Sequence, residues 1–535
     1  MSGRGMHLAA TSMLVVAGVG ALLAVGWPVG RMTAESFVAA AEATAPPLGG
    51  AIAISTALSL VVTVLATGLG FALALTARTL PRVPRRLLDA AIGGLVLVPP
   101  YTVAAALVAV GGRSGLFTAV LPDVYGLPGM AVAMTLAHLP IAYLMIRVAW
   151  RGVDPRLVET ARVNGARAGD VIRLVLLPPL RGPLGVTAAL TFVSTLSDPS
   201  IPAVLRGRVP ILAHTAYIEV IAWGGEGTAA LIAVLLTLPV LPMLLMLWRR
   251  PREALLETRW LGRGASPALV LPPSPPVQLC RVLSVLVLGV VLVLGLTSLA
   301  AMFRTQAQLV TPAMGTVISS TIQYALAALL LAAPLGVLTA WASARLGKTV
   351  ARGVDLLQIT LMLLPDTTLG IALFLAYGLA TPTPWGELPA LVGGASLGSG
   401  AVALVIAFAV QAVPLVHLAA RAGQRRTPRT VQETARLLGA SSRRRTVQFV
   451  LPHAGALVAA IAAAVTARNI VSVAPIVFVS TPEAPMVASF ALDLLDRASF
   501  EQTCALTGIV ATLVAGACAL VVAASWAMAG RRGAS

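Results

Sequence analysis

Long apolar segments, each bounded by clusters of Arg, Pro or Gly, recur along the whole chain. Many reach the roughly 20 residues that an α-helix needs to cross the hydrocarbon core of a bilayer. The pattern predicts an all-α, polytopic membrane protein with about twelve transmembrane helices. The predicted spans are residues 8–30, 51–77, 88–111, 130–150, 183–205, 228–248, 281–302, 318–343, 355–380, 400–420, 456–480 and 505–529.

Composition and charge agree with a membrane protein. Hydrophobic residues make up 58% of the chain and charged residues 11%, against about 25% charged residues in soluble domains. The net charge of +18 would suggest a nucleic-acid partner in a soluble chain. If the N-terminus is cytoplasmic, however, 31 of the 38 basic residues lie on the cytoplasmic side. The positive-inside rule then predicts two cytoplasmic termini and explains most of the basic excess without a nucleic-acid partner. A location in the inner (plasma) membrane and contact with membrane lipid are also expected.

The chain is predicted to contain two copies of one unit. A proline-rich segment separates a first repeat, residues 1–250, from a second, residues 281–535, with residues 251–280 as a cytoplasmic linker. Residues of the first repeat recur in the second at two constant offsets, 266 early in the repeat and 274 later. Two parallel six-helix repeats and a pseudo-two-fold axis along the membrane normal are expected. The recurring residues are Asp89, Pro99, Pro140, Arg147, Glu159, Gly165 and Pro178, matched by Asp355, Pro365, Pro414, Arg421, Glu433, Gly439 and Pro452.

The longest match lies between the fourth and fifth spans of each half. We name residues 151–178 the first repeated loop and residues 425–452 the second repeated loop. Each contains Glu-Thr-Ala, a glycine four residues after the alanine, and a Leu-Pro pair at the same spacing. An acidic residue suits the first turn of a helix, and glycine suits its C-terminal cap. We expect a short surface helix, a turn and a second helix, which together project from the membrane as a knob.

The pattern Glu-x-Ala-x3-Gly-x9-apolar-x-Leu-Pro resembles the EAA loop of permease subunits of binding-protein-dependent ATP-binding cassette (ABC) importers. The resemblance implies the type I importer permease fold and a short coupling helix that docks in a groove of a cytoplasmic ATPase. Two copies of that ATPase and an extracytoplasmic solute-binding protein are the implied partners. Thr160 and Thr434 stand where the family usually has a second alanine. The implied ATPase contacts are Glu159, Thr160, Ala161, Gly165, Glu433, Thr434, Ala435 and Gly439.

The fused, double-length form is most similar to the permeases for ferric iron, 2-aminoethylphosphonate and thiamine. The resemblance therefore implies import of a small solute of one of these kinds. Residues 125–129 and 195–198 favour the ferric iron and phosphonate members. The nearest approach to a phosphate-binding loop, residues 342–349, lacks the first glycine and ends a membrane helix. This chain is thus expected not to be an enzyme, and a separate subunit must hydrolyse ATP.

Charged residues inside the predicted spans are candidates for the translocation path, because an ionisable group at membrane depth is costly and usually faces a cavity or a partner. These candidates are Asp198 in the fifth span, Asp366 in the ninth and Arg468 in the eleventh. At the 274 offset, Asp198 and Arg468 align with Ser472 and Ser194, so a path between the halves would be chemically asymmetric. A salt bridge between helices is the alternative role for both charged residues.

Two prolines complete the set of path candidates. Pro99 and Pro365 lie within predicted spans. Each breaks its helix and frees backbone hydrogen-bonding groups, which neighbouring helices can satisfy. Unwound backbone of this kind often borders a path. On the opposite face, Asp493, Asp496 and Glu501 form a candidate docking patch for a binding protein, with a solvated loop as the alternative.

Two other classes of protein also fit twelve spans. An ion-gradient-driven secondary transporter shares the two parallel repeats, but predicts several buried acids and gives no reason for matched cytoplasmic loops. A membrane-embedded enzyme needs clustered nucleophiles, metal ligands or paired carboxylates. The three cysteines form no CxxC pair and the five histidines lack metal-ligand spacing. No catalytic residue, metal site or cofactor is therefore expected.

Overall fold

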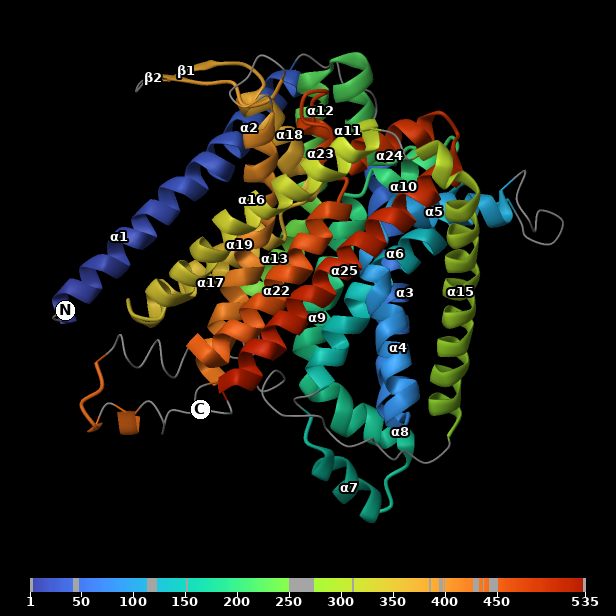
Figure 1. The fold of residues 1–535 in the computed structure, drawn as a ribbon, viewed down its shortest axis with the longest axis vertical. Helices are drawn as coiled ribbons and strands as arrows, with labels where there is room; N and C mark the ends of the chain where they lie inside the picture. Colours follow the sequence, from blue (N-terminus) through green and yellow to red (C-terminus); the bar gives the residue numbers. More distant parts are fainter. Residues whose placement is uncertain are drawn as a thin grey trace.

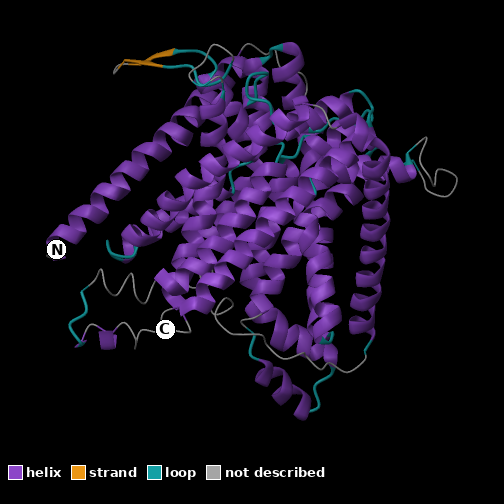
Figure 2. Cartoon of the chain, viewed as in Figure 1, coloured by secondary structure: helices purple, strands orange, loops and turns teal. Residues whose placement is uncertain are grey.

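The computed structural model describes residues 3–41, 48–112, 123–150, 153–249, 274–309, 312–383, 386–393, 398, 400–426, 433–435, 437–441 and 451–532. Almost all of these residues are helical, as Figure 2 shows. The described strands form one antiparallel hairpin, β1 (Thr381–Thr383) with β2 (Gly386–Leu388). The chain is an all-α, polytopic membrane protein, as its sequence predicts.

The first half runs through its helices in the order seen in Figure 1, from blue to green. Three of its segments are π-helical (η1, η4, η5) and two are 3-10 helices (η2, η6). Its elements are α1 (Gly3–Ala21), η1 (Leu22–Gly26), α2 (Trp27–Ala41), α3 (Gly49–Thr79), α4 (Arg82–Gly94), η2 (Leu95–Leu97), α5 (Pro100–Gly111), α6 (Leu127–Ala149), α7 (Pro155–Val163), α8 (Ala168–Asp170), η4 (Val171–Leu176), α9 (Leu177–Leu196), α10 (Ser200–Leu205), α11 (Leu212–Ile218), η5 (Glu219–Trp223), α12 (Glu226–Thr237), η6 (Leu238–Val240) and α13 (Leu241–Arg249).

The second half begins earlier than the sequence predicts. Its first helix starts at Pro275, inside the predicted linker 251–280, because proline is well tolerated in the first turn of a helix. Residues 250–273 of that linker lie outside the described residues. Besides the hairpin, the second half contains α15 (Pro275–Leu309), α16 (Pro312–Ser343), α17 (Lys348–Met362), α18 (Asp366–Tyr377), α19 (Ala401–Arg426), α22 (Leu451–Val471), α23 (Ile476–Val479), α24 (Val487–Asp496) and α25 (Phe500–Arg532).

Each of the twelve predicted spans overlaps an apolar helix or a bent pair of helices. Eight described helices are long and apolar enough to cross a membrane, and the number rises to ten when each bent pair counts as one span. The shorter apolar helices Leu457–Val471 and Phe500–Gly516 occupy the predicted eleventh and twelfth positions.

Two spans are broken at the prolines that the sequence singles out. Residues Arg82–Leu97 meet α5 at an angle of 103°, and α17 meets α18 at 92°. Pro99 and Pro365 are the N-cap residues of α5 and α18. Proline lacks a backbone N–H and disfavours a helical residue before it, so the chain turns and restarts as a new helix.

The fifth predicted span ends earlier than expected. Residues 183–205 were predicted as one helix, but α9 stops at Leu196 and α10 starts at Ser200. Asp198 therefore lies in the turn between two helices and not within a span. Pro199 follows Asp198 directly, which disfavours the helical conformation at Asp198.

Helices of each half pack on the other half, and these contacts match. The first span, α1 to α2, packs on α16 and α18 of the second half, and α15 packs on α3 and α5 of the first half. Likewise, α12 contacts α18, and α25 contacts α5. Each of these contacts between the halves thus has its counterpart after exchange of the halves. This is the arrangement expected of two parallel repeats around a pseudo-two-fold axis.

A pair of aligned glycines lies at close helix contacts, one in each half. Gly70 on α3 lies against the backbone of α6, where an added Cβ would be 3.0 Å from the nitrogen of Tyr143. Gly336, 266 residues later, lies against α19 in the same way, 3.0 Å from the nitrogen of His417. Small residues let membrane helices approach closely without a side chain between them. The two halves therefore share one mode of packing.

The two ends of the bundle differ. Figure 1 shows α7 projecting at one end, and the β1–β2 hairpin at the opposite end with α11 and α12. The beginning of α1 and the end of α25 both lie away from the hairpin. We refer below to the α7 end and the hairpin end of the bundle.

Candidate functional site

The first repeated loop folds as a short helix that leaves the bundle, α7 (Figure 1). The backbone N–H of Arg156 donates to Oδ1 of Asp154 at 3.0 Å, so Asp154 caps the helix. Pro155 takes the first helical position, where its missing N–H costs nothing. Glu159 consequently lies in the second turn of α7, and the prediction that it starts the helix is wrong. The Asp-Pro pair starts the helix earlier because it supplies both a cap and a fixed backbone angle.

Both repeated loops stop their helix at a glycine, as predicted. Gly165 has φ +79° and Gly439 has φ +75°, which is left-handed backbone. The residue after each glycine donates its backbone N–H to the carbonyl of the motif alanine five positions earlier, at 3.0 Å in the first loop and 2.9 Å in the second. This is the bond of a Schellman cap. Residues 433–435 and 437–441 of the second loop thus match the first loop at this helix end.

The predicted ATPase contacts lie mostly at the surface of these loops. Ala161 is half-buried and Ala435 is buried, while the motif glutamates, threonines and glycines of both loops are exposed. Next to the motif, Val163 and Leu437 occupy aligned positions and expose 88% and 87% of their area. Large apolar side chains exposed at the same place on two projecting loops are typical of a surface that binds a partner.

The base of α7 is anchored to the bundle by apolar packing. Val158 is buried in one cluster with Leu88 and Ile92 of α4 and with Tyr143 and Ile146 of α6. An apolar side chain of this size gains roughly 1.5–3 kcal/mol from burial. The base of α7 thus belongs to the same apolar cluster as α4 and α6.

A cavity of about 90 Å³ between the two halves brings three predicted path residues together: Asp198, Asp366 and Arg468 all line it. Ser472 and Ser194, the aligned partners of Asp198 and Arg468, line the same cavity. Both members of two aligned pairs therefore face one space. The cavity is lined by residues of both halves, and we name it the central cavity.

The broken spans also reach the central cavity. Pro100, the first residue of α5, and Asp366, the first residue of α18, are aligned at the 266 offset and both line it. Pro99 and Pro365 are not among its lining residues but immediately precede Pro100 and Asp366. Both helices thus begin at the cavity wall.

The charges of the central cavity are asymmetric, as the sequence predicts. Arg468 Nη2 donates to Asp366 Oδ2 at 3.3 Å, and Gln411 Nε2 donates to Asp366 Oδ1 at 3.0 Å. Arg468 therefore does form a salt bridge between helices, but within the second half. Asp198 is 7% exposed and accepts two bonds from Ser200 through Oδ1, while its Oδ2 has no hydrogen-bond partner among the described residues.

The sequence shows that Asp89 and Arg147 recur in the second half, but it does not show that they form an ion pair. Arg147 Nε and Nη2 donate to the two carboxylate oxygens of Asp89 at 2.9 and 3.1 Å. The hydroxyl of Tyr143 donates to the same carboxylate. The pair links α4 to the last turn of α6. A repeated acid and a repeated arginine in otherwise apolar segments were the signal that could have found it.

The aligned aspartate and arginine of the second half also form an ion pair. Arg421 Nε lies 3.3 Å from Oδ1 of Asp355, which links α19 to α17. His417, aligned with Tyr143, lies with Nε2 3.0 Å from the same oxygen and with Nδ1 3.0 Å from Thr339 Oγ1. The aspartate and the arginine are thus common to both halves, whereas the third member differs.

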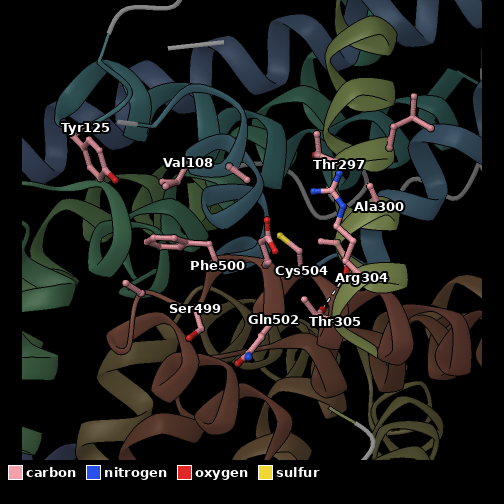
Figure 3. Close-up of a pocket in the computed structure, with 15 residues that line it drawn as sticks. Val108, Tyr125, Thr297, Ala300, Arg304, Thr305, Ser499, Phe500, Gln502 and Cys504 are labelled. Atoms are coloured by element: carbon pink, nitrogen blue, oxygen red, sulfur yellow. Dashed lines mark hydrogen bonds between the residues drawn. The ribbon is translucent and has the colours of Figure 1, made fainter. Parts of the chain in front are cut away.

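A second, larger cavity of about 970 Å³ lies among α5, α15 and the beginning of α25. Figure 3 shows Thr297 and Arg304 of α15 facing Phe500 and Cys504 of α25 across it. Glu501, one of the predicted docking residues, also lines this cavity. None of the predicted path residues does.

The other two predicted docking residues lie on α24. Asp493 forms an ion pair with Arg497 at 2.9 Å, so part of the acidic patch is neutralised. Burial, and then the neighbouring Asp493, raise the pKa of Asp496. No group of three or more His, Cys, Asp or Glu with the geometry of a metal site occurs in the part of the chain that the structure describes.

Residues 332–529 match the family of the binding-protein-dependent transport system inner membrane component. These residues include α17, α18, α19 and α22. These residues are therefore similar to the membrane permease component of transport systems that depend on a binding protein.

Curated relatives are permeases with different solutes in their names. The chain is 30% identical over 164 residues to a protein of Haemophilus influenzae assigned as a ferric transport system permease, covering 28% of this chain and 25% of that protein. It is 28% identical over 131 residues to the ferric transport system permease protein of Actinobacillus pleuropneumoniae, 23% of this chain and 19% of the relative. It is 27% identical over 192 residues to the molybdenum transport system permease protein of Escherichia coli, 34% of this chain and 83% of the relative. The matches span a quarter or less of the ferric relatives.

Proposed function

We propose that this chain is the membrane permease of an ABC importer and carries two permease repeats in one polypeptide, residues 1–250 and 281–535, joined by the linker 251–280. One observation carries the proposal: two loops, 274 residues apart, have the same glycine-capped helix end and the same exposed apolar position. A single-copy permease domain needs one such loop. Two loops fit two docking surfaces for an ATPase.

We place the chain in the inner membrane with the α7 end in the cytoplasm. Both termini then lie on the cytoplasmic side. The distribution of basic residues supports this orientation, because 31 of 38 then lie on the cytoplasmic side. Two copies of the ATPase bind the repeated loops through Glu159, Thr160, Ala161 and Gly165, and through the aligned residues 433, 434, 435 and 439. The binding protein docks at the hairpin end.

The proposed mechanism is alternating access. ATP closes the two ATPase subunits, the repeated loops move inward with them, and the halves rock about the pseudo-two-fold axis to open toward the binding protein. Each ligand must bind one state more tightly than the other for coupling to exist. The central cavity, with Asp198, Asp366 and Arg468 in its wall, lies on the solute path. The breaks after Pro99 and Pro365 supply the unwound backbone beside it.

We take ferric iron as the first candidate solute. The names of the two ferric permeases among the relatives support it. The molybdenum relative makes molybdate the comparison in any uptake experiment. The asymmetric cavity charges do not by themselves choose between these ions, because the two carboxylates are offset by Arg468 and by the positive ends of α5 and α18.

The ATPase-docking role is tested by placing a bulky cation at both loop glycines. Gly165→Arg with Gly439→Arg forces left-handed backbone on an arginine, at roughly 1–2 kcal/mol per site, and adds charge to the docking face. An added Cβ at either glycine meets nothing within 4 Å, so the bundle itself is not disturbed. We expect the variant to insert in the membrane but to lose co-purification of the ATPase.

Gly353→Arg is the matched control, because Gly353 is exposed near the start of α17 and its Cβ would also meet open space. The control should retain the ATPase. Unchanged co-purification by the double loop variant would refute the docking role. Uptake by the purified chain alone, driven by an ion gradient in vesicles that lack the ATPase, would refute the importer assignment itself.

A further inference from the structure

The two Asp–Arg pairs lie between the repeated loops and the central cavity. In the first half, Asp89 belongs to α4, and Arg147 to the last turn of α6, which leads into the first repeated loop. In the second half, Asp355 belongs to α17, and Arg421 to α19, which leads into the second repeated loop. Each pair therefore joins one arm of a broken span to the helix next to a loop.

The other end of each joined arm reaches the cavity wall. Leu95 and Val96 of η2, directly after α4, line the central cavity, and so does Val98 at the break. In the second half, α17 is followed within four residues by Asp366, which lines the same cavity. A rigid arm that moves at its Asp–Arg pair must also move the cavity wall.

The chemistry of the pair suits a firm connection. Apolar packing between helices is non-directional and allows small sliding, whereas a forked arginine–carboxylate contact fixes both distance and orientation. Asp89 and Arg147 form such a fork with two N···O distances of 2.9 and 3.1 Å. The pair is kept in both halves although Tyr143 is replaced by His417 at the third position. The constant element is the aspartate with the arginine.

We propose that the pairs Asp89–Arg147 and Asp355–Arg421 are positioning pairs that make α4 and α17 move together with the loop-side ends of α6 and α19. Displacement of a repeated loop by the ATPase is thereby transmitted to the wall of the central cavity. This inference rests on the proposed function. It assigns the pairs a role in coupling that a purely stabilising contact would not have.

The experiment follows the cavity wall directly, without depending on the solute. Val98→Cys is introduced into a chain whose Cys280, Cys504 and Cys518 are replaced by serine, and this parent is reconstituted with its ATPase. The rate of labelling by a thiol reagent is compared between nucleotide-free and ATP-trapped complexes. In the parent, the two rates should differ about five-fold or more, the low end of allosteric coupling.

Asp89→Asn in this parent should retain bound, ATP-hydrolysing ATPase but lose the difference between the two labelling rates. The charge swap Asp89→Arg with Arg147→Asp should restore the difference, which a nonspecific loss of stability would not allow. Glu35→Gln is the control: it removes a half-exposed ion pair with Arg31 on α2, at 3.8 Å, and should leave the difference intact.

The outcomes separate the two levels of the hypothesis. A full ATP-dependent difference in Asp89→Asn overturns the coupling role, and so does a charge-swap variant that folds but shows no difference. If Asp89→Asn cannot be purified, the charge swap alone decides between these results. Failure of the parent itself to bind the ATPase refutes the proposed function, and with it the inference.

Discussion

The substitution of one arginine in each half by methionine gives an internally controlled test of the Asp–Arg pairs. Arg421→Met and Arg147→Met make the same chemical change at aligned positions, and methionine retains much of the apolar stem. The two sites differ in burial. Arg421 and Asp355 are 8% and 3% exposed, whereas Arg147 and Asp89 are 14% and 37% exposed.

Burial sets the expected magnitudes. Loss of one partner from a buried ion pair costs about 3–5 kcal/mol, because the remaining charge is left in a low-dielectric interior. Asp89 is more than one-third exposed, so water takes over much of the lost interaction there, and the cost approaches the roughly 1 kcal/mol of surface pairs. Arg421→Met should therefore destabilise the protein by about 2–4 kcal/mol more than Arg147→Met.

The measurement is reversible unfolding in mixed detergent micelles, followed by helical circular dichroism, with both variants and the wild-type protein under identical conditions. Asp355→Asn and the double variant complete a cycle that isolates the pair from other effects of each substitution. Free energies of unfolding that agree within about 0.5 kcal/mol for the two arginine variants would refute the reasoning from burial.

Three further predictions use other parts of the molecule. Ala498→Gly should raise the free energy of unfolding by about 1 kcal/mol, measured in the same micelles, because Ala498 has φ +56° and a left-handed alanine is strained. Gly336→Ala should lower it by roughly 1–3 kcal/mol through overpacking of α16 on α19, whereas Gly353→Ala, which meets open space, should not lower it. Asp198→Asn and Arg468→Gln should each abolish solute-stimulated ATP turnover by the reconstituted importer. Wild-type stimulation in either variant removes that residue from the path.

Several features could be predicted from the sequence because they depend on local composition and spacing. The length of the apolar segments specifies membrane helices, and Pro99 and Pro365 favour breaks in them. The glycine caps of the repeated loops follow from backbone conformation alone: Gly165 and Gly439 are left-handed, as predicted. Constant offsets of 266 and 274 also predict two repeats without any knowledge of packing.

Local signals failed where two of them competed. The fifth span was predicted to continue past Asp198, but Pro199 and the bonds from Ser200 end α9 and start α10. In the first repeated loop, Asp154 and Pro155 start the helix one turn before the predicted position at Glu159. Hydrophobicity indicates which segments are buried. It does not indicate where a capping residue or a proline starts or ends a helix.

The partners of charged side chains were decided only by the tertiary structure. The sequence placed Asp198, Asp366 and Arg468 at membrane depth. Helix packing made Asp366 the partner of Arg468 and left Asp198 Oδ2 without a hydrogen-bond partner among the described residues. The contact between Asp89 and Arg147 joins residues 58 positions apart. Such pairs depend on the rotation and crossing of helices in three dimensions, which apolar periodicity along one helix does not encode.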